Sequence, residues 1–543
     1  MELSTKHIKV LDCTLRDGGY INDFNFGDEV IRGIILKLIK SNIDVIECGF
    51  LKDGEHKASS SVFSNASDLL QYIPKNRGNS SLVAMVDYGR YDISQLSNFN
   101  GKTIDGIRDC FFKKDRYDAL KLAEEIQKKG YNVYVQPVDI LGYSDKELIE
   151  LIERVNDLNT YAFSIVDTFG SMYMDDLVRV FSLIDHNLKK EVIMGFHSHN
   201  NMQLSFALSQ KFAEISQGKR NVTIDCTVLG MGRGAGNTPT ELVANYLNTK
   251  WSNYDYNLNE LLDLVDIYML PIQKYYSWGY DIPNYIAGIY SSHVHNVAYL
   301  IDKHNISTKD MRVIIESIDP VVRKRYDYDN LESLYVEHIN HKIDDSIDMK
   351  NLYSILNGKK ILILTPGKTL ETKKNEINEF IYKNNVIAIS TNFTPDDYIV
   401  KFSFFSNQKR LERNMEFRKK DIENVKLIIT SNIEINKPNI PIFSVNYSSL
   451  IKRKRWKFFD NSLILLIRLL NIIDVENIYI AGADGFSEND NYSENNRFLE
   501  ANISKETGMD INNEIKEMIQ DIMSTVKKKD YITFITPTIY TKK

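Results

Sequence analysis

The chain lacks the features that mark several large classes of protein. Its 543 residues include only 4 cysteines, and Cys13, Cys48, Cys110 and Cys226 are scattered with no Cys-x-x-Cys pair. This spacing predicts neither a disulfide framework nor a thiolate zinc site. We therefore expect a reduced, cytoplasmic protein.

Long apolar runs and an excess of one charge are also missing. The longest apolar run, within Ser462–Ile473, is interrupted by Arg468 and Asn471, and Met1–Lys9 has no signal-peptide core. A membrane span needs about 20 apolar residues, so we expect none. Lys and Arg total 67 against 73 Asp and Glu. This balance argues against a nucleic-acid-binding protein that relies on bulk positive charge.

The first half of the chain alternates short apolar runs with amphipathic segments. The predicted strands are Ile8–Asp12, Val45–Gly49, Leu82–Val86, Gly106–Phe111, Asn132–Val138, Ala162–Val166, Val192–Phe196 and Val222–Thr227. Nearly continuous hydrophobicity is typical of strands buried on both faces. The repeated alternation predicts an α/β fold, a TIM (β/α)₈ barrel over residues 1–255. A doubly wound open sheet is the alternative, but no G-x-G-x-x-G or P-loop follows the first strand.

Polar and glycine-rich segments follow the strands at the rim where such barrels carry catalytic residues. Thr14–Gly19 follows the first strand and Asp167–Gly170 the sixth. His197–Asn200 ends the seventh strand, and Gly230–Asn237 follows the eighth. We therefore predict the active site at the carboxyl ends of the strands.

Two histidines and one aspartate at this rim predict a metal site. His197 and His199 point the same way from an extended segment because side chains alternate with period two. Asp17 lies on the matching rim and offers an oxygen ligand, so the three predict a divalent-metal site with positions open for a 2-oxo acid. Mn²⁺ is the first expectation, with Mg²⁺, Co²⁺ and Zn²⁺ as alternatives. Arg16 is expected to stabilise an enolate oxygen, although a salt bridge within the rim would also explain it.

Three motifs carry a family resemblance. Leu11–Gly19 (LDCTLRDGG), His197–Asn200 (HSHN) and Gly230–Asn237 (GMGRGAGN) resemble the DRE-TIM metallolyases, the HMGL-like proteins. These include 4-hydroxy-2-oxoacid aldolases, hydroxymethylglutaryl-CoA lyase, acyl-CoA condensing synthases and carboxyltransferases. The resemblance implies that the metal ligands are Asp17, His197 and His199 and that the substrate-binding residues are Arg16, Thr168 and Asn237.

Local sequence favours the aldolase branch, closest to 4-hydroxy-2-oxovalerate aldolases. The loop Met231–Arg233 lacks the cysteine of the lyase branch, and Val166 stands where carboxyltransferases need a lysine. The loop Gly232–Asn237 also looks more like the aldolase branch than the synthases, which usually carry Glu-Arg before Ala-Gly-Asn. Ala287–Ser292 resembles the aldolase segment with an active-site tyrosine, which implies that role for Tyr290.

One departure concerns the catalytic base. The aldolases of this branch carry a histidine just after the Arg-Asp-Gly motif, where this chain has Tyr20. A tyrosine of ordinary pKa, near 10, is a poor base at pH 7. Proton transfer then falls either to Tyr20 with Tyr290 or to a histidine such as His293 or His295. Both histidines lie in a predicted helix, Ala287–Leu300, in which residues i and i+2 do not share a face, so we expect at most one to face the site.

A second α/β pattern follows the barrel. Residues 256–357 are predicted to be a helical extension and linker, and 358–543 a Rossmann-like domain. Its first strand, Ile361–Thr365, leads to Pro366–Thr369, which is not a P-loop because the upstream glycine is absent. With Ile478–Phe486, this start resembles bacterial sialyltransferase-related domains, which implies a nucleotide-sugar or glycan-precursor site at Gly367 and Asp484. A structural or oligomerisation domain is the alternative.

These observations predict a metal-dependent carbon–carbon lyase. We expect an aldolase that joins or separates pyruvate, as an enolate stabilised by the metal, and an aldehyde, for which a sugar-derived compound of surface-polysaccharide synthesis is one candidate. A Claisen-type acyl-CoA condensing synthase and a non-catalytic barrel that scaffolds the second domain are the alternatives. The expected partners are a small 2-oxo acid, an aldehyde and further copies of the chain in a homo-oligomer.

Overall fold

The computed structural model describes most of the chain. The described residues are 6–304, 306–339, 342–422, 424–435, 440–452, 456, 461–487, 491–493, 496–497, 505–526, 528 and 530–540. They form two compact units, the first made of Met1–Tyr299 with Thr308–Tyr326 and the second of Leu300–Ser307 with Asp327–Lys543. Among the described residues, no helix combines the length and the apolar content that crossing a bilayer requires.

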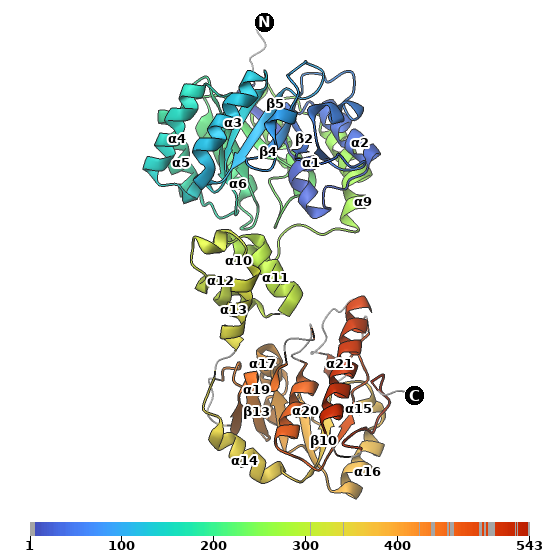
Figure 1. The fold of residues 1–543 in the computed structure, drawn as a ribbon. Coiled ribbons are helices and arrows are strands. Elements are labelled where there is room, and N and C mark those ends of the chain that lie inside the picture. The colour runs from blue at the N-terminus through green and yellow to red at the C-terminus, as the bar shows by residue number, and fades with distance from the viewer. Residues whose placement is uncertain are drawn as a thin grey trace. The chain divides into compact units, whose positions relative to one another are not determined.

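The first unit is built on a closed barrel of parallel strands (Figure 1). The barrel strands are β1 (Ile8–Asp12), β2 (Val45–Leu51), β4 (Ser81–Asp87), β5 (Gly106–Phe111), β6 (Asn132–Pro137), β7 (Ala162–Asp167), β8 (Ile193–Ser198) and β9 (Val222–Cys226). Their order is β1-β9-β8-β7-β6-β5-β4-β2, and parallel pairing of β1 with β2 closes the ring. A short strand, β3 (Val62–Phe63), pairs with the end of β2. The predicted TIM barrel is confirmed, as is each of its predicted strands.

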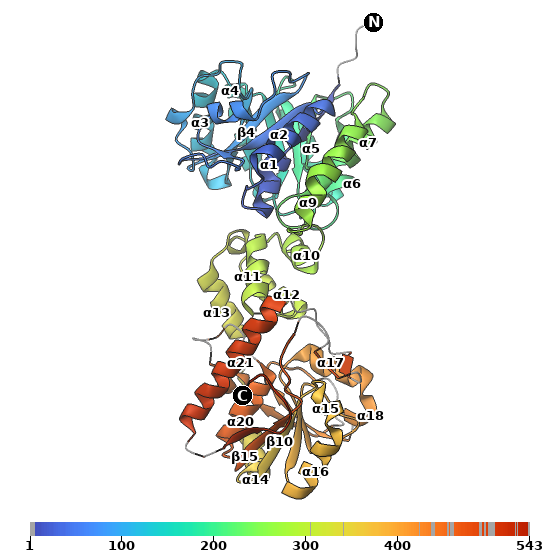
Figure 2. The same ribbon diagram turned by 90° about the vertical axis from the view of Figure 1, so that its right-hand side faces the viewer.

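Helices cover the outside of the barrel, as both ribbon views show (Figures 1 and 2). They are α2 (Asp28–Lys40), α3 (Arg116–Lys128), α4 (Asp145–Leu158), α5 (Met174–Asn187), α6 (Ser205–Ser216) and α7 (Thr240–Lys250). Their boundaries follow local chemistry. In α4, Ser144 and Glu147 form a capping box at the start, and Asn159 ends the helix in the left-handed conformation.

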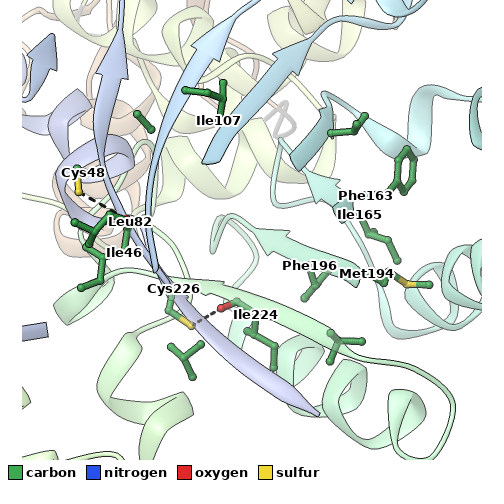
Figure 3. Close-up of a cluster of buried hydrophobic side chains, with 14 of the residues drawn as sticks. Ile46, Cys48, Leu82, Ile107, Phe163, Ile165, Met194, Phe196, Ile224 and Cys226 are labelled. Carbon is green, nitrogen blue, oxygen red and sulfur yellow. Dashed lines mark hydrogen bonds between the residues drawn. The ribbon is translucent and has the colours of Figure 1, made fainter. Parts of the chain in front are cut away.

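Alternation along the strands separates an apolar shell from a polar interior. Phe196, Ile224 and Cys226 point outward into the shell between strands and helices, part of which is drawn in Figure 3. The adjacent residues His197 and Asp225 point the other way, toward the barrel axis, and their side chains hydrogen-bond to each other. The strands thus bury an apolar face against the helices and direct titratable side chains toward the barrel axis.

The segment after the barrel is helical and contributes to both compact units. It contains α10 (Ile282–Ile289), α11 (Val294–His304), α12 (Thr308–Ser317), α13 (Tyr328–Ile339) and α14 (Ser346–Leu356). The turn at residues 323–326 bonds to the barrel, since Lys324 Nζ lies 2.6 Å from an oxygen of Asp139. In the second unit, His304 stacks on Tyr335 with ring centroids 3.6 Å apart. The compact units therefore divide within this segment rather than at the boundaries predicted near residues 255 and 357.

The expectation of one helix over Ala287–Leu300 is wrong. Helix α10 ends at Ile289 and α11 begins at Val294. Ser291 has a φ of 49°, in the left-handed region that interrupts a helix. The His293 N–H then donates to the carbonyl oxygen of Arg323 at 2.9 Å instead of continuing the helix.

The second unit contains an open parallel sheet with helices on both faces (Figure 2). Its strands are β10 (Lys360–Leu364), β11 (Ile387–Thr391), β12 (Phe402–Phe405), β13 (Lys426–Thr430), β14 (Ile442–Val445), β15 (Asn477–Ala481) and β16 (Ile532–Phe534). The order β14-β13-β12-β11-β10-β15-β16 reverses direction at β10. The predicted Rossmann-like α/β architecture is confirmed, although β16 and helix α21 (Lys505–Thr525) were not predicted.

Candidate active site

Asp17 reaches the barrel rim through a one-turn helix. Helix α1 (Thr14–Asp17) follows β1 directly, and the Asp17 N–H donates to the Cys13 carbonyl at 2.8 Å. The Cys13 N–H in turn donates to the carbonyl of Cys226, at the end of β9, at 2.8 Å. Asp17 is fully buried. The turn therefore fixes its carboxylate against the neighbouring strand ends.

His197 and His199 are held by the end of β8 and by the glycine-rich loop. His199 pairs with Asn237 in an isolated antiparallel bridge, and the Asn200 N–H donates to the Gly236 carbonyl at 2.8 Å. Gly236 has a φ of 85°, and a Cβ there would lie 2.0 Å from the carbonyl oxygen of Gly230. Only glycine allows this close return of the loop, which is what brings Asn237 beside the two histidines.

The three sequence-predicted metal ligands converge. Nε2 of His197 lies 3.2 Å and Nε2 of His199 lies 3.7 Å from the same oxygen, Oδ2 of Asp17. The amide nitrogen of Asn237 donates to that oxygen at 2.7 Å and lies 3.3 Å from His197 Nε2. One carboxylate and two imidazoles therefore surround a single point at the barrel mouth.

Hydrogen bonding fixes the tautomer of His197. Nδ1 lies 3.0 Å from Asp225 Oδ2, an atom that can only accept from it when that carboxylate is ionised. Nδ1 therefore carries the hydrogen, and Nε2 directs its lone pair toward the Asp17 carboxylate. A lone pair and an anionic oxygen repel each other unless a proton or a cation lies between them. Burial lowers the His197 pKa, yet the bonds to Asp17 and Asp225 raise it overall, which shows how strongly the position attracts positive charge.

Electrostatics keep the other two ligands in metal-binding form. Burial opposes the charge of Asp17, but Arg16 and the two imidazoles hold the pKa of Asp17 well below its usual range. Burial lowers the pKa of His199 to about 3, so its imidazole is neutral at pH 7. Oδ1 of Asp17 is buried and accepts no hydrogen bond among the described residues. The ionised carboxylate of Asp17, the neutral imidazole of His199 and Nε2 of His197, where a cation can take the place of a proton, together fit a divalent cation.

A buried ion-pair network supports this cluster from inside the barrel. Glu47 Oε2 accepts from Arg16 Nε at 2.7 Å and from Arg108 at 2.9 Å. Arg108 continues to Asp225 and so reaches His197. The carboxylates of Asp17, Glu47 and Asp225 exceed the two guanidiniums by one negative charge. A bound cation would offset that excess, which is a second reason why the site fits a metal.

Cys13 offers a competing ligand set that sequence reasoning did not consider. Single donor atoms of Cys13, Asp17 and His197 lie within 4.8 Å of one another. Cys13 Sγ, however, lies 3.2 Å from the Cys226 carbonyl, to which it donates, and burial raises the pKa of the thiol well above its ordinary value. A protonated thiol is a poor metal ligand. His199 is therefore the better third member of the set.

The cluster opens into a cavity of about 650 Å³ at the barrel mouth. Arg16, His197 and His199 lie on its wall, as do Thr168 and Tyr20. Thr168 Oγ1 accepts from the Asp139 N–H at 2.8 Å, which leaves its own hydroxyl hydrogen available to an acceptor. Burial raises the pKa of Tyr20 to about 12, so its hydroxyl stays protonated at neutral pH.

The helical segment after the barrel forms a second wall of the cavity. Of the predicted residues that it carries, two line the cavity and one does not. His293 and His295 both line the cavity, with ring centroids 4.7 Å apart, so the expectation that at most one faces it is wrong. His293 Nδ1 accepts from the His295 N–H at 3.2 Å. Tyr290 does not line this cavity, because its hydroxyl accepts from Arg312 at 2.8 Å on the helical segment.

Sequence reasoning missed the inner network and part of the second wall. Arg108 and Asp225 sit within strands that were identified by their apolar residues alone. A charged residue inside a buried strand is a signal in itself, because it needs a partner or a function. Arg233, Arg325 and Tyr326 also line the cavity. Their place depends on tertiary packing that periodicity does not reveal.

In the second unit, the two predicted positions lie together. The Thr369 N–H donates to Asp484 Oδ2 at 2.8 Å, and a Cβ on Gly367 would lie 2.1 Å from the Gly482 carbonyl. Gly367 and Asp484 line a separate cavity of about 120 Å³. It lies at the carboxyl ends of β10 and β15, the point of strand reversal where such sheets bind ligands.

Comparison with known proteins gives a consistent result for the barrel. A family model described as HMGL-like matches residues 7–267. The 4-hydroxy-2-oxovalerate aldolase of Thermomicrobium roseum is 27% identical over 323 residues, which cover 56% of this chain and 85% of that protein. The oxaloacetate decarboxylase of Mycobacterium tuberculosis is 26% identical over 255 residues, 47% of this chain and 74% of that protein.

A synthase is also among the relatives. The 2-isopropylmalate synthase of Staphylococcus aureus is 27% identical over 268 residues, which cover 46% of this chain and 50% of that protein. The match at residues 7–267 spans the barrel and every residue of the Asp17, His197 and His199 cluster. Residues 7–267, which include the whole barrel, therefore form a domain that matches the HMGL-like family model and is similar to the relatives named above.

Proposed function

We propose that the barrel is a divalent-metal-dependent aldolase that makes or cleaves the bond between pyruvate and an aldehyde. The convergence of Asp17, His197 and His199 on one point of the cavity wall carries this proposal. A metal held there would supply Lewis-acid chemistry at the keto oxygen of a 2-oxo acid. Two relatives are named for 2-oxo acids, 4-hydroxy-2-oxovalerate and oxaloacetate, and each of these compounds gives pyruvate when its C3–C4 bond breaks.

Arg16 is the residue proposed to stabilise the enolate. Its Nε donates to Glu47 at 2.7 Å and its Nη1 lies 3.3 Å from Asp17 Oδ1, so the guanidinium is fixed beside the proposed metal ligands while it lines the cavity. A rigid, permanently charged donor costs little reorganisation when negative charge develops on the enolate oxygen. The free hydroxyl hydrogen of Thr168 is suited to hold the substrate carboxylate.

The proton transfer is assigned to His295. In the cleavage direction a base takes the proton of the C4 hydroxyl, the electrons of the C3–C4 bond remain on C3 as the pyruvate enolate, and C4 leaves as the aldehyde. Tyr20 stays protonated, and His293 uses its Nδ1 lone pair on the His295 N–H. Burial and Arg233 lower the pKa of His295, so its imidazole is neutral and able to accept a proton at pH 7.

Hydrogen exchange tests the proposal. Protein with Mn²⁺ and pyruvate in D₂O should exchange the pyruvate methyl hydrogens, followed by NMR, and a chelator or Asp17→Asn should abolish the exchange. Asp118→Asn is the matched control, because Asp118 is an exposed residue of α3 that pairs with Lys121. Absence of exchange with Mn²⁺, Mg²⁺, Co²⁺ and Zn²⁺ in folded protein would overturn the proposal.

Two further measurements separate the alternatives. His295→Gln should slow aldol cleavage by roughly 10²-fold or more, the loss expected for a general base, whereas His293→Gln should have the smaller effect. The reverse ranking would move the base to His293. Release of thiol from acetyl-CoA in the presence of a 2-oxo acid would instead indicate a condensing synthase.

A further inference from the structure

The wall of this cavity carries positive charge that carboxylates offset only in part. Its charged residues are Arg16, Asp87, Arg90, Lys114, Asp115, Arg233, Lys324 and Arg325. Most of these cations have carboxylate partners: Arg90 lies 3.3 Å from Asp87, Lys114 lies 3.9 Å from Asp115, and Lys324 lies 2.6 Å from Asp139. Arg16 pairs with Glu47.

Arg233 and Arg325 are the exceptions. Among the described residues neither lies within ion-pair distance of a carboxylate; Arg233 lies over the ring of Tyr20 at 5.3 Å and Arg325 over that of Phe112 at 6.0 Å. Contacts with ring faces leave the in-plane N–H donors of a guanidinium free for an anion. Two unpaired guanidiniums on one cavity are therefore a recognition element for negative charge.

The turn that carries Arg325 is held rigidly. The buried Asn296 amide donates to the carbonyl oxygens of Arg323 and Arg325, each at 2.9 Å. The ion pair between Lys324 and Asp139 ties the same turn to the loop after β6. Arg325 thus projects from a fixed backbone, which favours a specific ligand contact over a mobile surface charge.

His293 adds a neutral donor to this wall. Its Nδ1 accepts from the His295 N–H, so its hydrogen is on Nε2. Burial, with a contribution from Arg233, lowers the His293 pKa to about 3, which keeps the ring neutral. Imidazole N–H and guanidinium donors together match the oxygens of a phosphate or carboxylate.

The size of the cavity also favours a second substrate larger than acetaldehyde. A volume of about 650 Å³ corresponds to roughly 20 waters at about 30 Å³ each, whereas pyruvate and acetaldehyde together have about 9 non-hydrogen atoms. We propose that the aldehyde substrate carries an anionic group, a phosphate or a carboxylate, which Arg233 and Arg325 bind while the aldehyde carbon faces the metal ligands. This inference rests on the proposed aldolase function and names the class of its second substrate.

The test compares matched aldehydes in condensation with pyruvate. Glyceraldehyde 3-phosphate against glyceraldehyde tests a phosphate, and succinic semialdehyde against butyraldehyde tests a carboxylate. We expect kcat/KM for one anionic member to exceed that of its neutral partner at least 100-fold. Arg233→Gln and Arg325→Gln should each reduce this preference at least 10-fold, and Arg325→Gln should leave pyruvate methyl exchange intact. Arg179→Gln, an exposed arginine of α5 paired with Asp145, is the control.

The outcomes separate this inference from the proposed function. Methyl exchange without any preference for an anionic aldehyde, or a preference that survives both substitutions, would overturn the anion site and leave the aldolase standing. Should exchange itself fail, calorimetric titration with inorganic phosphate still bears on the site. Phosphate binding by the wild type that is lost in both arginine variants supports the anion site. No phosphate binding by the wild type, or equal binding by the wild type and the variants, counts against the anion site.

Discussion

Nδ1 of His197 donates to Oδ2 of Asp225 across 3.0 Å inside the barrel. This bond decides which ring nitrogen of His197 faces Asp17 and keeps the imidazole from rotating. Asp225 also pairs with Arg108, so the orientation of a proposed ligand depends on a network that spans the barrel from β5 to β9. A carboxylate behind a ligating histidine is a recurrent means of raising its basicity and fixing its direction.

Replacing that carboxylate should weaken metal binding without removing a ligand. We expect Asp225→Asn to reduce Mn²⁺ affinity about 10- to 100-fold, the usual cost of losing such a supporting group. Isothermal titration measures the affinity, and circular dichroism at the same temperature checks that the variant is folded. Asp118→Asn should bind as the wild type does. Unchanged affinity in a folded Asp225→Asn protein would show that His197 does not need this partner.

Metal binding should stabilise the barrel alone. The predicted ligands all belong to the first compact unit, and a ligand at about 100 times its Kd adds about 2.7 kcal/mol to the free energy of unfolding. Calorimetric scans with Mn²⁺ and with chelator should therefore show one transition that shifts by several degrees and one that does not. A barrel transition whose temperature does not change with Mn²⁺, or equal shifts of the two unfolding transitions, would contradict the proposed site.

Gly49 should tolerate no side chain. It has a φ of 146°, and a Cβ there would lie 1.9 Å from the Ser61 carbonyl oxygen, which is backbone and cannot turn away. Gly49→Ala should lower the free energy of unfolding by about 3 kcal/mol or more, since strain and overpacking add. Gly54→Ala is matched, with a φ of 114° and nothing within 4 Å, and should cost only about 1 kcal/mol. Urea unfolding followed by circular dichroism measures both, and equal losses would refute the steric argument.

Asp12 should make the barrel less stable as the pH rises. Burial raises its folded pKa to about 6, above the ordinary value of an unfolded aspartate. The folded state therefore holds its proton more tightly, and the stability this provides is present below about pH 4 and lost as the pH rises through 6. Relative to the wild type, Asp12→Asn should gain up to about 3 kcal/mol between pH 4 and pH 7, at about 1.4 kcal/mol for each pKa unit. Curves of the free energy of unfolding against pH that run parallel for the wild type and Asp12→Asn would contradict this prediction.

The parts of the fold that sequence predicted are those that local pattern determines. A run such as Ala162–Val166 indicates a buried strand because its length and hydrophobicity suit little else, and β7 contains all of it. His197, His199 and Asp17 could be brought together on paper because strand alternation and barrel closure impose their positions. The same argument put Thr168 and Asn237 at this rim, while the family resemblance implied that they bind substrate.

What sequence could not provide depends on contacts between distant segments. Whether Tyr290 or His293 faces the cavity depends on a left-handed residue, Ser291, and on a bond from His293 to Arg323. Neither has a periodic signature. The choice of Mn²⁺, a sugar-derived aldehyde, a homo-oligomer and a nucleotide-sugar site near Gly367 and Asp484 all stay predictions.

The turn at residues 323–326 has an evolutionary consequence. The proposed metal ligands and Arg16 come from the barrel, while His295 and Arg325 reach the cavity from a segment that lies outside the HMGL-like match at residues 7–267. Mutations near Arg325 could change which aldehyde is accepted while the metal ligands and Arg16 stay in place. Grafting residues 282–326 between related barrels would then offer a modular way to reprogram which carbonyl compound is accepted.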